Sequence, residues 1–185
     1  MGKTHKISCA GFGGQGVMSM GQLLTYAGMI DGKEVSWVPA YGPEMRGGTA
    51  NCSVIVSDEP VGSPIFEEGV TTAVVMNLPS FHKFVPKVAP GGSIFVNSSI
   101  ITEKVDRTDV NVYYIPANDI ANELGNAKLI NIIMLGAVIE IDKIVEPESI
   151  LKAFLKVFGD NKAKLIPINR EALAKGAEIA KSLVK

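Results

Sequence analysis

A glycine-rich run between a short apolar stretch and a helical one constrains how the first half of this chain can fold. The run reads Gly11-Phe12-Gly13-Gly14-Gln15-Gly16-Val17. Glycine loses more backbone freedom on folding than any other residue, so a cluster persists where the chain needs positive φ or where another group must approach the main chain closely. The spacing also fits G-x-G-x-x-G, whose amides can hold a pyrophosphate at a helix N-terminus. A ligand phosphate, a neighbouring helix and another subunit are all candidates for that group.

The strand expected after the first helix tests the dinucleotide interpretation. In a dinucleotide-binding fold an Asp or Glu ends this strand, about 20 residues after the loop, and binds the ribose hydroxyls. Trp37, Val38 and Pro39 occupy that place, and Glu34 begins the strand instead. NAD and FAD are therefore disfavoured, which leaves a tight structural turn or the binding of another anion or a partner's backbone. Gln15 adds amide donors and an acceptor that a purely structural turn would not need.

A second glycine- and proline-punctuated loop follows that strand at residues 39–48. Its Arg46 has a planar fork that can bind a phosphate or carboxylate, but Glu44 lies two residues away and an internal ion pair fits equally. Tyr41 can stack on an aromatic ligand or cover the end of the sheet. Because loops after parallel strands meet at the carboxyl edge of a sheet, we expect residues 11–16 and 41–48 to face one another. One shared site or one interface would use both loops.

Apolar periodicity elsewhere predicts alternating strands and helices. The expected strands are residues 6–10, 34–38, 50–56, 73–76, 93–96 and 110–115, with a hairpin that returns through residues 61–64. The expected helices are residues 17–31, 80–85, 116–125, 129–141, 147–158 and a last one, capped by Asn169, that reaches Val184. The apolar helix at 129–141 must be buried. These elements predict a three-layer α/β/α single domain over residues 1–185, with a mostly parallel, mixed sheet.

Composition narrows the classes of partner. A chain of 185 residues with 46% hydrophobic content can bury one sizeable core, and its net charge of −1 offers no basic field for nucleic acid or an anionic membrane. No apolar run is long enough to span a bilayer and no signal-peptide core is present, so we expect a cytoplasmic protein. Cys9 and Cys52 lie in apolar strand-like segments, which favours buried reduced thiols over a disulfide or metal site. Without a C-x-x-C motif, we expect no iron–sulfur cluster on this chain.

The remaining candidates do not assemble into a self-contained catalytic site. His5 lies near the N-terminus and His82 lies in a short helix without a Ser or Cys motif around it, so neither supports a nucleophilic triad or a metal site. Asn131 interrupts an apolar helix and should be hydrogen-bonded if buried. A structural bond to a loop backbone is favoured there over a direct ligand contact. We therefore expect no catalytic residue on this chain alone.

The two loops together point to a family. The glycine run, the block Tyr41-Gly42-Pro43-Glu44-Met45-Arg46-Gly47-Gly48 and the later Ser57-Asp58-Glu59-Pro60-Val61 resemble the gamma subunit of 2-oxoacid:ferredoxin oxidoreductases. The resemblance extends through Asn131 and Gly136-Ala137 to the C-terminal helices. Residues 40–51 are more similar to 2-oxoglutarate-type than to pyruvate-type gamma subunits. Branched-chain 2-oxoacid and indolepyruvate oxidoreductases contain similar domains.

The resemblance implies a heterotetrameric enzyme that converts a 2-oxoacid to an acyl-CoA and reduces ferredoxin. Thiamine diphosphate, Mg and 4Fe-4S clusters would lie in alpha, beta and delta (ferredoxin-like) partner subunits, and coenzyme A would be a co-substrate. This chain would serve assembly and coenzyme A access, and an isolated homodimer is compatible with the resemblance. The residues expected to contact coenzyme A or a neighbouring subunit are Gly11, Gly13, Gly14, Gln15, Gly16, Tyr41, Glu44, Arg46 and Gly47. The alternative is a free-standing nucleotide- or anion-binding module.

Overall fold

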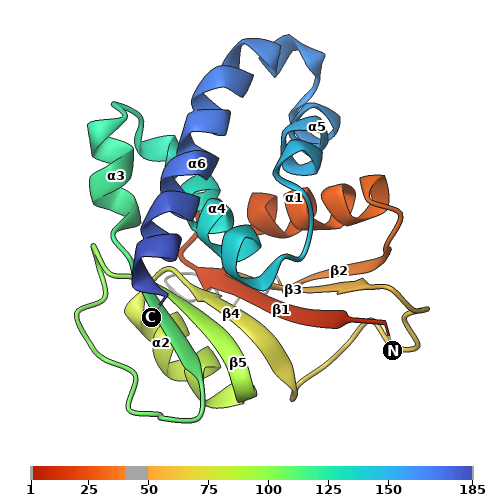
Figure 1. Cartoon of the computed structure of the whole chain (residues 1–185), viewed down its shortest axis with the longest axis vertical. Helices are drawn as coiled ribbons and strands as arrows, with labels where there is room; N and C mark the ends of the chain where they lie inside the picture. Colours follow the sequence, from red (N-terminus) through yellow and green to blue (C-terminus); the bar gives the residue numbers. More distant parts are fainter. Residues whose placement is uncertain (1, 41–49, 185) are drawn as a thin grey trace.

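A computed structural model describes residues 2–40 and 50–184. Its centre is a six-stranded sheet in the order β2-β3-β1-β4-β5-β6 (Figure 1). The strands are β1 (Thr4–Gly11), β2 (Glu34–Ala40), β3 (Ala50–Ser57), β4 (Val70–Val75), β5 (Val88–Asn97) and β6 (Asn111–Ile115). The helices are α1 (Val17–Ile30), α2 (Leu78–Phe84), α3 (Ala117–Glu123), α4 (Ile130–Asp142), α5 (Pro147–Phe158) and α6 (Ile166–Leu183). Short 3₁₀ turns at Val85–Lys87, Ala127–Leu129 and Asp160–Leu165 connect them.

The sheet is mixed, as predicted, but its antiparallel strand is not the predicted one. β3 runs antiparallel to both β1 and β2, whereas the β1–β4, β4–β5 and β5–β6 pairs are parallel. The expected hairpin through residues 61–64 is wrong, since residues 58–69 contain no strand. Pro60 and Pro64 have no N–H to donate to a ladder. β3 instead inserts between β1 and β2, so these two strands are parallel but not neighbours.

The helices form two unequal layers, which confirms the predicted three-layer α/β/α architecture. α1, α4, α5 and α6 pack on one face of the sheet, while α2 and the segment before β6 cover the other (Figure 1). Alternate residues of each strand divide between the faces, so that Ile7 and Cys9 of β1 join the larger core and Ala10 joins the smaller. The larger core is therefore built mainly from helices meeting over β1 and β3.

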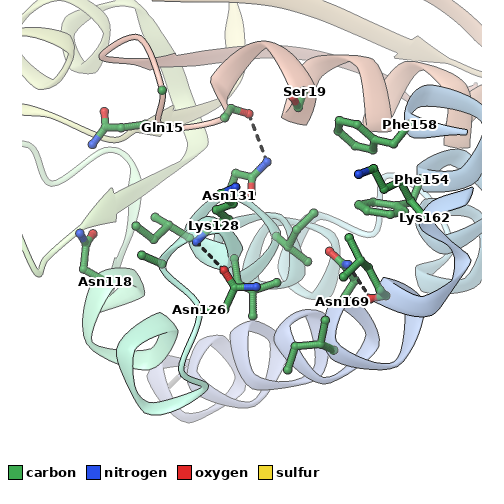
Figure 2. A pocket seen from close by; sticks show the side chains of 18 residues that line it. Gln15, Ser19, Asn118, Asn126, Lys128, Asn131, Phe154, Phe158, Lys162 and Asn169 are labelled. Carbon is green, nitrogen blue, oxygen red and sulfur yellow. Dashed lines mark hydrogen bonds between the residues drawn. The ribbon is translucent and has the colours of Figure 1, made fainter.

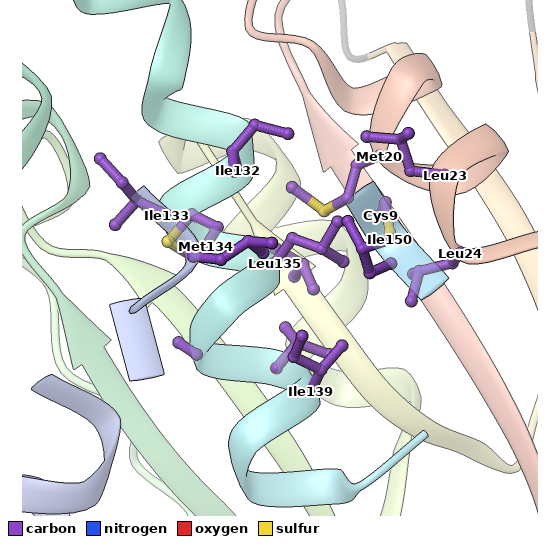
Figure 3. Packing of buried hydrophobic residues seen from close by; sticks show 14 of the residues in the cluster. Cys9, Met20, Leu23, Leu24, Ile132, Ile133, Met134, Leu135, Ile139 and Ile150 are labelled. Carbon is purple, nitrogen blue, oxygen red and sulfur yellow. The ribbon is translucent and has the colours of Figure 1, made fainter. Parts of the chain in front are cut away.

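α4 lies at the centre of the larger core, as its apolar sequence predicts. Its residues from Ile132 to Ile139 are buried, with α6 as the main packing partner, and side chains of α1 and α5 join them in the same core (Figure 3). α6 crosses α4 very closely: a Cβ added at Gly136 would lie 2.8 Å from the Leu173 carbonyl carbon, and one at Gly176 would lie 2.8 Å from the Ile133 carbonyl carbon. Glycine at both positions is what allows the two backbones to touch.

The predicted cap of the last helix is wrong. α6 begins at Ile166, so Asn169 lies within its first turns and is 4% exposed. Its Nδ2 donates to the carbonyl oxygen of Leu165, 2.7 Å away, rather than its Oδ1 accepting from a backbone amide. Pro167 at the start of the helix explains the earlier beginning, because its fixed φ suits a first turn.

Candidate functional site

Three glycines of the run between residues 11 and 16 are required by the chain's own fold. Gly14 and Gly16 have φ of +91° and +75°, in the left-handed region, and Gly16 is the N-cap of α1. A Cβ at Gly11 would lie 2.7 Å from Gln15 Oε1 and 2.8 Å from the Met76 Cβ. This part of the run is explained by the fold, without a ligand.

Gly13 is different. Its φ lies outside the left-handed region, it is exposed, and a Cβ placed on it would meet nothing within 4 Å. Among the described residues, neither backbone conformation nor packing requires glycine there. Within residues 2–40 and 50–184, nothing occupies the space beside Gly13 that a Cβ would take.

Gln15 has a structural role, contrary to the expectation that its amide is superfluous to the turn. Its Oε1 accepts from the Phe12 backbone N–H at 2.7 Å, and its Nε2 donates to the Met76 carbonyl oxygen at 3.0 Å. Both ends of the amide therefore fasten the loop to itself and to the residue that follows β4. The Gln15 side chain therefore holds the backbone of the glycine loop in one conformation.

Asn131 fastens the other side of the loop, as the sequence predicts. The side chain is 8% exposed and its Nδ2 donates to the Gly16 carbonyl oxygen at 3.3 Å. A Cβ at Gly16 would lie 2.6 Å from that Nδ2, so this glycine admits Asn131 as well as the left-handed turn. The bond joins α4 to the start of α1.

The second loop is predicted at residues 39–48, but Pro39 and Ala40 belong to the end of β2. Residues 41–48, with Tyr41, Glu44, Arg46 and Gly47, lie outside the described residues. The strands that carry its two ends are described. β3 begins at Ala50, which pairs with Gly11 of β1, and β2 ends at Ala40, which pairs with Asn51. β2 therefore ends, and β3 begins, at the same end of the sheet where β1 leads into the glycine loop.

A cleft of about 500 Å³ opens beside the glycine loop (Figure 2). Its walls come from the loop, the turn before α4, and the facing ends of α5 and α6. The lining residues are Gly14, Gln15, Gly16, Ser19, Asn118, Asn126, Ala127, Lys128, Leu129, Ile130, Asn131, Ile132, Phe154, Phe158, Lys162, Leu165, Ile168 and Asn169. This volume lies within the range of small-molecule sites.

The chemistry of the cleft is cationic and aromatic. Lys128 and Lys162 line it, and none of its lining residues within 2–40 and 50–184 is Asp or Glu. Within residues 2–40 and 50–184 neither lysine takes part in an ion pair. The rings of Phe154 and Phe158 lie 4.7 Å apart, tilted by 46°, and form an apolar wall. An anion with an apolar or heterocyclic part complements this arrangement.

Side-chain amides supply further hydrogen-bonding groups. Asn126 Oδ1 accepts from the Lys128 backbone N–H at 3.0 Å, and Asn118 Oδ1 accepts from Asn97 Nδ2 at 2.8 Å. In the described part of the chain, the side-chain NH₂ groups of Asn118 and Asn126 make no hydrogen bond, so they are available as donors. Sequence reasoning missed this cleft, because its residues come from separate elements and form no local motif.

The histidines and acidic groups form no second centre. Burial, followed by the positive charges of Lys3 and Lys33, lowers the pKa of His5 to about 4. The His82 side chain is exposed, and its Nε2 lies 3.4 Å from Glu103 Oε1. No group of three or more His, Cys, Asp or Glu suited to a metal occurs across residues 2–40 and 50–184. In the same residues, no helix is both long and apolar enough to cross a membrane.

Fold and site together define a class: an α/β domain with a mixed six-stranded sheet, in which the glycine loop lines a cationic cleft. The chain belongs to the pyruvate ferredoxin/flavodoxin oxidoreductase family, whose model matches residues 6–179. This confirms the family identified from the paired loops.

Curated relatives fall into two lengths. The chain is 38% identical over 180 residues to the ketoisovalerate oxidoreductase subunit VorA of Methanothermobacter thermautotrophicus, with 97% of this chain but only 37% of that relative covered. It is 34% identical over 184 residues to the 2-oxoglutarate synthase subunit KorC of Methanocaldococcus jannaschii, covering 96% of this chain and 95% of the relative. The chain thus spans about a third of the longer relatives and nearly all of the shorter one.

Solved structures show the same fold. The gamma subunit of the keto/oxoacid ferredoxin oxidoreductase from Geobacter sulfurreducens superposes with a TM-score of 0.81 at 27% identity, covering 96% of this chain and 99% of that one. The 2-oxoglutarate:ferredoxin oxidoreductase from Magnetococcus marinus, solved with 2-oxoglutarate, coenzyme A and succinyl-CoA bound, superposes with a TM-score of 0.88 at 26% identity. The match covers 99% of this chain and 32% of that one.

Proposed function

We propose that this chain is the gamma-type component of a 2-oxoacid:ferredoxin oxidoreductase, a cytoplasmic complex that converts a 2-oxoacid to an acyl-CoA and passes the electrons to ferredoxin. Family membership and the names of the relatives support this role. In this proposal, alpha, beta and delta subunits carry thiamine diphosphate, Mg and the 4Fe-4S clusters.

Within the complex, we assign the glycine loop and the adjoining cleft to coenzyme A. The observation that carries this assignment is the cleft lining, whose described residues present two lysines, two phenylalanines and no carboxylate next to Gly14, Gln15 and Gly16 of the glycine loop. Coenzyme A combines phosphates with an aromatic base and a long uncharged arm. Lys128 and Lys162 would attract its phosphates, the phenylalanine wall would contact its apolar parts, and Asn118 and Asn126 would donate hydrogen bonds.

Variants of the cleft lysines test the assignment in the reconstituted complex. Lys128→Ala and Lys162→Ala should each raise the KM for coenzyme A by about tenfold, the size expected for one charge-assisted contact, and leave the KM for the 2-oxoacid unchanged. Lys152→Ala is the matched control, because Lys152 is an exposed lysine of α5 outside the cleft. Equal KM values for coenzyme A in all three variants would refute the assignment.

For the substrate we propose 2-oxoglutarate. The similarity of residues 40–51 to 2-oxoglutarate-type chains favours it, as does the nearly full-length match to the M. jannaschii subunit KorC. A panel of 2-oxoglutarate, 2-oxoisovalerate and pyruvate, assayed as ferredoxin reduction by the purified complex, decides among them. If kcat/KM were highest with 2-oxoisovalerate, the substrate would instead be the one suggested by the similarity to subunit VorA.

The alternative function is a free-standing nucleotide- or anion-binding module. Calorimetry of the full chain with coenzyme A, ADP and NAD separates the two, because the module requires appreciable binding without partners. Co-purification with thiamine- and cluster-containing subunits would support the proposal that the chain is an oxidoreductase subunit. Purification of the native protein alone, with 2-oxoacid-dependent ferredoxin reduction unaffected by its deletion, would contradict it.

A further inference from the structure

The two cysteines lie opposite one another at the base of the glycine loop. Cys9 of β1 and Cys52 of β3 are direct partners in the antiparallel ladder, so their side chains leave the same face of the sheet. Both are free thiols, with exposed fractions of 0% and 1%. Cys9 lies among side chains of α1 and α5, next to Met20 and Ile150 (Figure 3). Two thiols on neighbouring strands and one face are placed to react with each other.

An unpartnered donor is also directed at this pair. Trp37 Nε1 is buried and makes no hydrogen bond to a neutral acceptor in the described residues. The Cys52 sulfur lies near it, and the indole N–H lowers the pKa of Cys52 as a donor to the thiolate form. A buried N–H without an acceptor is costly, and a thiolate at Cys52 would satisfy it.

α1 closes over this arrangement through Gly21. A Cβ added there would lie 2.5 Å from Cys52 Sγ and 2.8 Å from Trp37 Nε1. Only glycine at this helical position allows α1 to lie on the thiol and the indole at once. The Cys52 thiol in turn donates to the Val17 carbonyl oxygen, 3.6 Å away, at the first residue of α1.

The acidities of the two thiols diverge. A hydrogen bond from Cys9 lowers the pKa of Cys52 despite its burial, and the Trp37 N–H and the Gly21 backbone act in the same direction. The same contact, together with burial, raises the pKa of Cys9. Because the Trp37 indole N–H lies near the Cys52 sulfur, we assign the attacking thiolate to Cys52.

We propose that Cys9 and Cys52 are a site of reversible oxidation, at which a small hydroperoxide converts the facing thiols to an intramolecular disulfide. The Cys52 thiolate attacks the hydroperoxide, its O–O bond breaks, and Cys52 becomes a sulfenic acid as an alcohol or water leaves. The Cys9 sulfur then attacks the Cys52 sulfur and water leaves with the Cys9 proton. Two thiols lose two electrons and two protons, and the hydroperoxide is reduced by the same two electrons. A dithiol reverses the change by exchange.

Oxidation at this site reaches the glycine loop. The S–H of Cys52 that donates to the Val17 carbonyl is lost in the disulfide, and Cys9 lies two residues before Gly11. The start of α1 and the end of β1, which hold the loop between them, are both altered. This inference stands independently of the coenzyme A assignment, because it rests on the two thiols and Trp37 alone.

The test uses the full reduced chain, with hydrogen peroxide as the probe. We expect the intact mass to fall by two hydrogen atoms, the titratable thiols to disappear together, and dithiothreitol to restore both. Trp37 is the only tryptophan in the sequence, so quenching of its fluorescence should follow the same time course. Two titratable thiols after exposure, under conditions that oxidise the urea-unfolded chain, would overturn the proposal. Disulfide-linked dimers in place of the internal bond would also overturn it.

Variants assign the two roles. In Cys9→Ala, oxidation should stop at a sulfenic acid on Cys52 that a dione reagent traps, whereas Cys52→Ala should resist the peroxide. Trp37→Phe should slow the reaction by about tenfold, since it removes one donor to the thiolate. Tyr26→Phe, an exposed aromatic position on α1, is its control. A trap on Cys9 in Cys52→Ala, or an unchanged rate in Trp37→Phe, would overturn the assignment of Cys52 as the attacking thiol.

Discussion

Gly136→Ala is the sharpest test of how the helical layer is held together. The added Cβ would lie 2.8 Å from the Leu173 carbonyl carbon and 2.9 Å from its Cα, while its ordinary contacts begin at 3.4 Å. These are backbone atoms, which cannot rotate away as a side chain can. α4 and α6 would therefore have to separate by more than half an ångström along their crossing.

The cost follows from that displacement. A gap of about 0.5–1 Å forfeits roughly a quarter to a half of each van der Waals contact across an interface. Overpacking of this kind costs about 1–3 kcal/mol, and we take the upper end because the obstacle is backbone. The better helix propensity of alanine offsets about 1 kcal/mol of this loss in stability. The net loss is about 2 kcal/mol, which lowers the Tm of a domain of this size by about 4–8 °C.

Thermal unfolding followed by circular dichroism measures this loss. Gly62→Ala is the control, since a Cβ at that exposed loop position meets nothing within 4 Å and its Tm should stay within about 1 °C. Gly176→Ala, on the other side of the same crossing, should lower the Tm by a similar amount. A Tm for Gly136→Ala equal to or above that of the unmodified chain would refute the reasoning, because helix propensity would then outweigh the close crossing.

Two further predictions concern polar groups that position helices and strands. The pKa of His5 is lowered to about 4 from 6.5, so the unfolded state binds a proton more readily, and stability should fall by up to about 3 kcal/mol as the pH drops from 6.5 toward 4. His5→Phe should flatten that part of the pH profile in urea unfolding, and an unchanged slope would show that His5 titrates freely. Asp31 caps α5 from outside that helix, with Oδ2 accepting from the Glu146 N–H at 2.8 Å and Oδ1 accepting from the Ser149 hydroxyl. Asp31→Ala should lower the free energy of unfolding, measured in urea, by about 1–2 kcal/mol. Asp106→Ala, at an exposed position, is the control and should change it negligibly. Equal losses in the two variants would show that Asp31 does not stabilise α5.

Local patterns in the sequence were sufficient to predict most elements and part of the site. The apolar periodicity of α1 and α4 reflects their burial, and the glycine loop could be placed because it follows β1 and precedes α1. Asn131 could be read as a structural donor because an amide inside an apolar helix requires a partner. Each of these inferences depends on neighbours along the chain.

The failures come from contacts between distant segments. The sequence does not reveal that β3 lies between β1 and β2, because the alternation along residues 50–56 would be the same whichever strands paired with it. Asn169 resembles a cap in sequence, but Pro167 starts α6 earlier. The cleft needs Phe158 and Lys162 to meet the loop after β1, and no local pattern signals that meeting.

The central claim is that the open main chain at Gly13 receives a group from outside this chain. Gly13→Ala tests it most directly, because the new Cβ meets none of the described residues within 4 Å. We predict an unchanged Tm for the purified chain and a KM for coenzyme A raised by about tenfold in the reconstituted complex, since a methyl group would fill the space of the incoming ligand. An unchanged KM for coenzyme A, with normal assembly of the complex, would contradict the account.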